Sequence, residues 1–152
     1  MKLRLAALIL VGAMVLTPAM AAECVGPEVV KATQVRQLQT QLMVAALKCS
    51  HMPEHAASYN SFVRTFGSQI ADSARVIMGH FKQANPKDSQ RSFDRFITQL
   101  ANDASTHSIN ATDFCENIGQ TFNSVMGLRG PELASFAATT INGHTAVPSR
   151  CN

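Results

Sequence analysis

The sequence of 152 residues has no tryptophan, a single tyrosine at position 59, and a charged fraction of only 15%. Its formal net charge is +3, and lysine and arginine nowhere form a run. A surface that binds nucleic acid needs a basic stripe, often with aromatic side chains on which bases stack. The composition therefore argues against a nucleic-acid-binding protein.

Several catalytic and cofactor signatures are also missing. The chain has no G-x-S-x-G, no P-loop and no G-x-G-x-x-G. Its four cysteines, Cys24, Cys49, Cys115 and Cys151, show no C-x-x-C or C-x-x-C-H spacing. Redox, c-type haem and paired-cysteine zinc sites use such spacings, so structural disulfides are the favoured interpretation of these cysteines.

A long hydrophobic run is absent too. The longest apolar stretch, residues 5–16, is shorter than the ~20 residues that span a bilayer. It follows a basic start and precedes small residues at positions 19 and 21, which is the order of a cleavable secretion signal. The alternative is a buried N-terminal helix. We expect a signal peptide over residues 1–21 and a single helical domain over residues 22–152.

Removal of this signal would take Lys2 and Arg4 away and leave a formal charge of +1. Glu23 precedes Cys24, where a lipoprotein signal needs a small residue, so we expect no lipid anchor. The expected location is periplasmic or secreted, with no membrane span in the mature chain. Such a compartment permits disulfides.

Apolar residues recur at helical spacing along the rest of the chain, and no strand-like alternation is found. Pro27 and Glu28 suit the first turn of a helix that ends near Cys49. A continuous stripe over residues 59–81 predicts one uninterrupted second helix. Two further helices, with caps at Asp88 or Ser89 and at Asn110 or Thr112, and a short fifth helix from Pro131 complete the pattern.

The expected fold is an all-α, four-to-five-helix bundle braced by two disulfides. Its aromatic stripes could line a ligand cavity, but a packed core is the interpretation that we favour. Short connectors make successive helices antiparallel, which brings Cys49 and Cys115 to one end. Cys24 and the C-terminal Cys151 are left to pair with each other. Four cysteines allow three connectivities in all.

One motif suggests a metal. His51-Met52-Pro53-Glu54-His55 matches H-x-x-E-H, in which both histidines bind zinc and the glutamate acts as general base. Pro53 opposes the helix that would place both histidines on one face. The alternatives are a polar connector between helices and a surface site for zinc, copper or nickel at His51 and His55, with Met52 as a possible further ligand.

A third zinc ligand would have to come from elsewhere in the chain, such as Glu116 or Glu132. The favoured expectation is no cofactor, with zinc or copper as the alternative.

Four segments carry a resemblance: LQTQLMVAALKC at 38–49, YNSFV at 59–63, RFITQLAN at 95–102 and FC at 114–115. Together they resemble small secreted, four-cysteine helical proteins of Gram-negative bacteria. The resemblance implies a periplasmic address, and no activity or site residue comes with it.

The leading functional hypothesis is a non-enzymatic periplasmic protein that serves as an interaction, binding or stress-related module. Its motivation is a complete helical core pattern without a catalytic set of residues. A partner is most simply another periplasmic protein. The rival hypothesis is a small metal-binding protein or metal-dependent hydrolase that uses His51 and His55.

Overall fold

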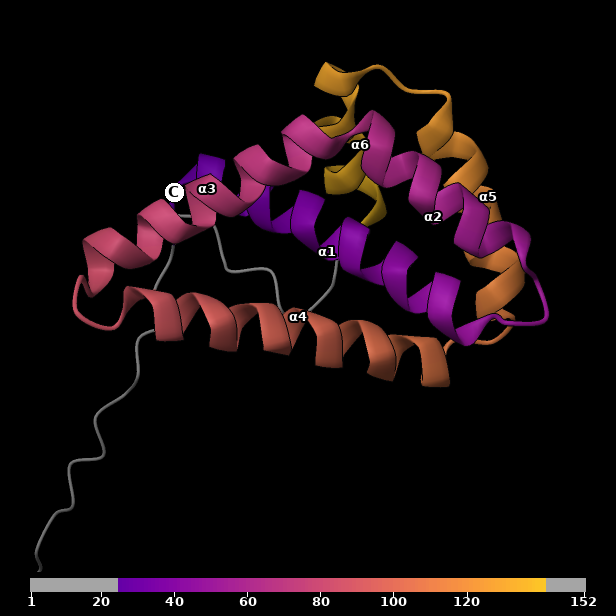
Figure 1. Ribbon diagram of the computed structural model, residues 1–152, viewed down its shortest axis with the longest axis horizontal. Helices are drawn as coiled ribbons and strands as arrows, with labels where there is room; N and C mark the ends of the chain where they lie inside the picture. Colours follow the sequence, from indigo (N-terminus) through magenta and orange to yellow (C-terminus); the bar gives the residue numbers. More distant parts are fainter. Residues whose placement is uncertain (1–24, 142–152) are drawn as a thin grey trace, which may run out of the picture.

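The computed structural model describes residues 25–141, and these residues are all-helical (Figure 1). They form six α-helices and one short 3-10 helix: α1 Pro27–Lys48, α2 Glu54–Thr65, α3 Gly67–Ala84, α4 Ser89–Asn110, α5 Phe114–Met126, η1 Gly130–Glu132 and α6 Leu133–Thr140. The predicted all-α class is confirmed. The predicted signal peptide, Cys24 and Cys151 lie outside the described residues.

Helix α1 is the central element, because it contacts all five other α-helices. Figure 1 shows it between α4 on one side and the α2–α3 segment on the other. Its predicted apolar face is buried at Leu38, Leu42 and Ala45, which have no exposed surface. It also buries polar residues on other sides: Thr33, Gln37, Thr40 and Gln41. Neighbouring helices therefore cover more than one face of α1, while residues near its two ends, such as Lys31 and Leu47, remain exposed.

The predicted second helix is divided in two, which raises the number of α-helices above the expected four to five. Phe66 leaves the helical conformation, with φ −109° and ψ 18°, and Gly67 begins α3. The side chains of Phe62 and Phe66 are fully buried, with ring centroids 5.3 Å apart. Because of the break, the two halves of the predicted helix pack on different neighbours: α2 packs on α5, and α3 packs on α4.

One of the two predicted helix caps is found at its expected position, and the other differs. Asp88 does precede α4, but neither it nor Ser89 caps the helix through its side chain. Helix α5 begins after Asp113 rather than after Asn110 or Thr112, and Asp113 adopts a left-handed backbone with φ 52°. Aspartate is one of the few residues besides glycine that visit this region. The turn positions Cys115 in the first turn of α5.

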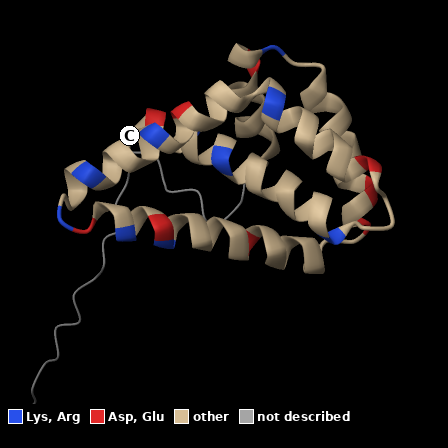
Figure 2. Cartoon of the chain, viewed as in Figure 1, with Lys and Arg blue, Asp and Glu red and all other residues tan. Residues whose placement is uncertain are grey.

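The predicted aromatic and aliphatic stripes form the core. Its fully or nearly fully buried members include Leu38, Leu42, Phe62, Phe66, Phe122, Val125, Leu133 and Ile141. Lysine, arginine and carboxylate side chains are spread over the helices rather than gathered in one patch (Figure 2). Within residues 25–141, none of the helices combines the length and apolarity that crossing a bilayer requires.

Candidate functional site

A disulfide joins Cys49, at the end of α1, to Cys115, in the first turn of α5. The two Cα atoms lie 5.7 Å apart, within the ordinary range for such a bond. This is the pair that the antiparallel argument favoured. The other proposed pair, Cys24 with Cys151, lies outside the described residues. We call the region around Cys49–Cys115, with the start of α2, the disulfide end.

His55 is a buried residue at the disulfide end. Its side chain lies in the first turn of α2 and only 3% of its surface is exposed. The ring atom Nε2 is 2.8 Å from the backbone oxygen of Cys115, and the ring centroid is 5.3 Å from that of Phe122. Because a carbonyl oxygen only accepts, Nε2 must carry the proton and donate it.

Gly119 of α5 provides the space for this ring. A Cβ atom at that position would lie 3.3 Å from Cε1 of His55, closer than ordinary van der Waals contact. The histidine is thus held by α5 through a hydrogen bond, a ring contact and a close backbone approach. These contacts are those of a core residue.

The geometry of the H-x-x-E-H segment differs from that of a zinc site. Pro53 precedes α2, so His51 lies outside the helix and is exposed while His55 is buried. Glu132, one suggested third ligand, accepts the backbone N–H of Arg129 at 2.7 Å. The described part of the chain contains no group of three histidine, cysteine, aspartate or glutamate side chains placed to hold a metal. The surroundings of His55 favour a structural role.

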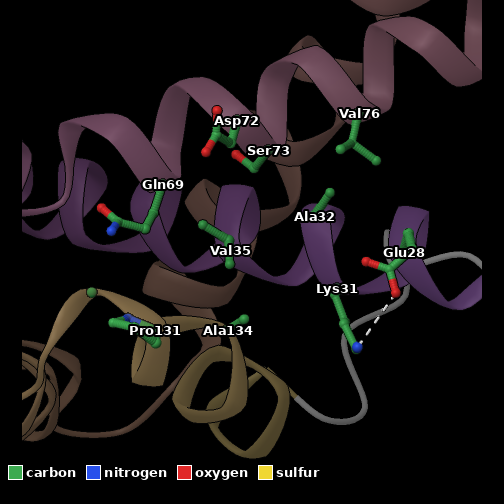
Figure 3. A pocket seen from close by; sticks show the side chains of 11 residues that line it. Glu28, Lys31, Ala32, Val35, Gln69, Asp72, Ser73, Val76, Pro131 and Ala134 are labelled. Carbon is green, nitrogen blue, oxygen red and sulfur yellow. Dashed lines mark hydrogen bonds and ion pairs between the residues drawn. The ribbon is translucent and has the colours of Figure 1, made fainter.

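A groove lies between α1, α3 and the η1–α6 segment (Figure 3). Its volume is about 240 Å³. The residues that line it are Glu28, Lys31, Ala32, Val35, Gln69, Asp72, Ser73, Val76, Gly130, Pro131 and Ala134. We call this surface the α1–α3–α6 groove.

The floor of the groove belongs to the interior of the protein. Ala32, Val35 and Ser73 are buried, and the Ser73 hydroxyl donates to the backbone oxygen of Ile70 at 2.7 Å. Because this hydroxyl is already satisfied, the floor offers mainly apolar contacts. Val76, which is 39% exposed, extends the apolar surface toward solvent.

The rim of the groove is polar and carries both signs of charge. Lys31 and Glu28 form an ion pair at 3.5 Å, drawn as a dashed line in Figure 3. Asp72 pairs with Arg75 at 2.6 Å along α3. Both pairs are exposed, and such pairs add little to stability. Their effect is to surround an apolar floor with groups that remain hydrated.

Gly130 of η1 lies beside the side chain of Gln69 of α3 in the lining of the groove. A Cβ atom at this position would overlap the side-chain amide nitrogen of Gln69. A side chain at this position would require the Gln69 amide to move. No local sequence pattern indicates that Gly130 lies beside Gln69, which is 61 positions earlier in the chain.

A second apolar surface lies near the ends of α1 and α4. Leu47 is 75% exposed and Ile109 is 73% exposed, and both line the same shallow hollow. Lys48 spans this hollow, since its Nζ donates to the hydroxyl of Ser108 at 3.0 Å. The hollow has a volume of about 360 Å³, and its lining combines the buried Ser108 with the exposed Leu47 and Ile109.

Several polar groups that lie outside the predicted apolar face are buried along α1. Gln37 donates from Nε2 to Oδ2 of Asp103 on α4 at 3.0 Å, while its own Oε1 has no hydrogen-bond partner. The Arg36 guanidinium donates to Gln39 at 2.7 Å, and its Nε is buried without a partner. Burial lowers the pKa of Arg36, although Tyr59 opposes this change.

The four-residue spacing of Thr33, Gln37 and Gln41 was the available signal for this buried polar row. It places the three side chains on one helical face.

Comparison with known proteins gave no match to a protein family, to a curated protein or to a solved structure. The function must therefore be argued from the surfaces of this chain alone.

Proposed function

We propose that this chain is a secreted, non-enzymatic helical binding module, and that it holds a partner protein in the α1–α3–α6 groove. The observation that supports this function is the combination of a buried apolar floor with a hydrated rim. Protein interfaces share this arrangement of an apolar centre and a polar border. A concave apolar surface with a few polar groups is also where ligands usually bind.

The dimensions of the groove favour an anchor residue of a partner over an extended flat contact. A space of about 240 Å³ receives one large apolar side chain together with neighbouring backbone. Binding energy in protein interfaces is concentrated in such anchors, seated in pockets near the centre. The mixed charges of Glu28, Lys31 and Asp72 would contribute to orientation more than to affinity.

The proposed location rests on the disulfide and the predicted secretion signal. Cys49–Cys115 is a bond of the kind that persists in oxidising compartments. A disulfide and the absence of a membrane-crossing helix among residues 25–141 are both compatible with the periplasm or the cell exterior. The second bond, Cys24–Cys151, belongs to this proposal and would tie the chain ends together.

The test is capture of a partner by variants of the groove. Ala134→Arg would place a long charged side chain in the groove, and Val76→Asp would put a carboxylate on its apolar edge. Both residues are at least partly exposed, so the fold should tolerate the changes. A partner cross-linked to the wild-type protein in a periplasmic extract should be lost from both variants.

Leu47→Asp is the matched control, because it removes an exposed aliphatic side chain from the other apolar surface. It should retain the partner. Loss of the partner only from Leu47→Asp would move the interface to the α1–α4 hollow. Retention by all three variants would contradict the proposed groove.

A further inference from the structure

Arg36 is a half-buried cation without a counter-ion, in the middle of α1. It belongs to none of the ion pairs found among residues 25–141, such as Lys31–Glu28 and Arg75–Asp72. It is also the only charged residue of α1 between Lys31 and Lys48. Charges removed from water are normally paired, because desolvation penalises an isolated ion. Arg36 is thus a cation whose partner is missing from the described chain.

The guanidinium of Arg36 has donors to spare. Of the five N–H groups of an arginine, one on Nη1 donates to Oε1 of Gln39 at 2.7 Å. Nε has no partner but is enclosed, so a ligand has no access to it. Nη2 donates to no group of residues 25–141 either, and it is not among the enclosed atoms. Its two N–H groups are therefore the ones that an outside acceptor can reach.

Gln39 links Arg36 to Tyr59 of α2. The Gln39 side chain accepts from Arg36 with Oε1 and donates from Nε2 to the Tyr59 hydroxyl oxygen at 3.4 Å. Because this oxygen accepts, the proton of the Tyr59 hydroxyl remains for another acceptor. Burial lowers the pKa of Arg36, and Tyr59 is the neighbour that opposes this change. Two helices thus bring a cation and a hydroxyl donor close together.

The charge and shape of this cluster favour a carboxylate over other anions. The two oxygens of a carboxylate match the planar fork of a guanidinium and accept charge-assisted hydrogen bonds from it. A single negative charge also neutralises Arg36 without excess. A dianion such as sulfate would leave a net negative charge at a half-buried position, where desolvation penalises it.

We propose that Arg36 binds a carboxylate group from outside the chain through its Nη2 donors, with the Tyr59 hydroxyl beside it. Acetate is the simplest molecule that carries this group, and a glutamate side chain of another protein presents the same group. Arg36, Gln39 and Tyr59 do not line the α1–α3–α6 groove, so this site is separate from the one proposed for the partner.

The sequence provides a local probe for the experiment. Tyr59 is the only tyrosine and the chain has no tryptophan, so its fluorescence reports on this cluster. The full chain is titrated with sodium acetate, and sodium chloride at equal ionic strength serves as the reference because salt screens charges in general. Acetate should change the Tyr59 fluorescence with a Kd of roughly 10–100 mM, as expected for one charge-assisted contact. The enclosed Arg36 Nε–H, followed by heteronuclear NMR, should shift with the same midpoint.

Arg36→Met removes the charge and keeps an unbranched side chain, so the saturable response to acetate should disappear. Acetate should then raise the melting temperature of the wild type above that in chloride, and not that of the variant. Arg36→Lys keeps the charge without the fork and should weaken acetate about 3–10-fold. Arg64→Met is the matched control, since Arg64 is an exposed arginine of α2 that donates to Ser61 at 3.1 Å. It should bind acetate as the wild type does.

A second arm distinguishes the two sources of the carboxylate. A blocked alanine–glutamate–alanine peptide is compared with the same peptide containing glutamine. A response to the glutamate peptide alone, with the Kd of acetate, would assign the site to an acidic side chain of a protein. A response to acetate without a response to either peptide would assign it to a small carboxylic acid.

Three results would overturn the proposal. The first is the absence of a saturable difference between acetate and chloride up to about 500 mM, five times the upper expected Kd. The second is acetate binding that persists in folded Arg36→Met or is undiminished in Arg36→Lys. The third is equal loss of binding in Arg64→Met, which would show that acetate responds to the positive charge of the surface in general. Circular dichroism verifies that each variant is folded.

Discussion

The two ends of the helical bundle differ in how completely their interior is filled. At the disulfide end, Cys49 is fully buried, Phe122 is 2% exposed, and His55 contacts Phe122 while its Nε2 bonds to the backbone of α5. At the opposite end, where α3 connects to α4, Phe81 and Phe96 are only half-buried. We call this second region the hairpin end.

The hairpin end also contains a small cavity between α1, α3 and α4, with a volume of about 160 Å³, and the unpartnered hydroxyl of Thr33. Its described contacts are between helices, and the disulfide of the described residues lies at the other end. Regions of lower local stability are where binding sites are commonly found, because an imperfect interior leaves room for a ligand. The contrast shows that the interior is filled more completely at the disulfide end than at the hairpin end.

The largest expected effect comes from removing one aromatic ring at each end. Phe122→Ala should lower the free energy of unfolding by about 3–5 kcal/mol, because removing a fully packed ring leaves a cavity in the core. Phe96→Ala should cost about 1–2 kcal/mol, since its ring is half-exposed and already borders empty space. Urea titrations of both variants measure the difference. Equal losses would show that the two ends are packed alike.

The next effect comes from breaking the covalent link at the disulfide end. Replacing Cys49 and Cys115 together by serine should lower the free energy of unfolding by about 2–4 kcal/mol, because the bond closes a loop between residues 66 positions apart. Urea unfolding measures this loss. Peptide mapping without reductant provides the accompanying check of connectivity. A peptide that links Cys24 to Cys49 would contradict the pairing.

The smallest expected effect separates the structural and metal-binding interpretations of the two histidines. His55→Ala should cost about 1–3 kcal/mol, since it removes a buried hydrogen bond and a ring contact. His51→Ala, at an exposed position, should stay within about 0.5 kcal/mol of the wild type. Thermal unfolding measures both. A metal site would instead give measurable zinc binding after dialysis that both variants lose.

The sequence predicted the helical class because each helix needs an apolar face to pack, and such faces repeat every three or four residues. It missed the break at Phe66 because the apolar stripe continues through it. Phe62, Phe66 and Ile70 stay in register and are all buried on both sides of the break. The spacing of apolar residues indicates which side chains point into the core. It does not reveal a break in the helix when the same side chains stay buried on both sides of the break.

The candidate site was harder to predict for a different reason. The α1–α3–α6 groove depends on contacts between distant segments, such as Gly130 with Gln69, which no local pattern reveals. His55 was visible as part of a motif, but its inward orientation follows from a hydrogen bond to residue 115 in another helix. Thr33 and Gln37 were not expected in the interior, because polar residues are usually exposed.

The central position of α1 has a consequence for which changes the chain tolerates. Successive residues of a helix are separated by about 100° around its axis. Deleting one residue in the middle of α1 would therefore turn all the following side chains away from their present neighbours. Since α1 contacts five other helices, several interfaces would be mismatched at once. A deletion in α5, which contacts fewer helices, would disturb fewer interfaces, so variation in length should be found outside α1.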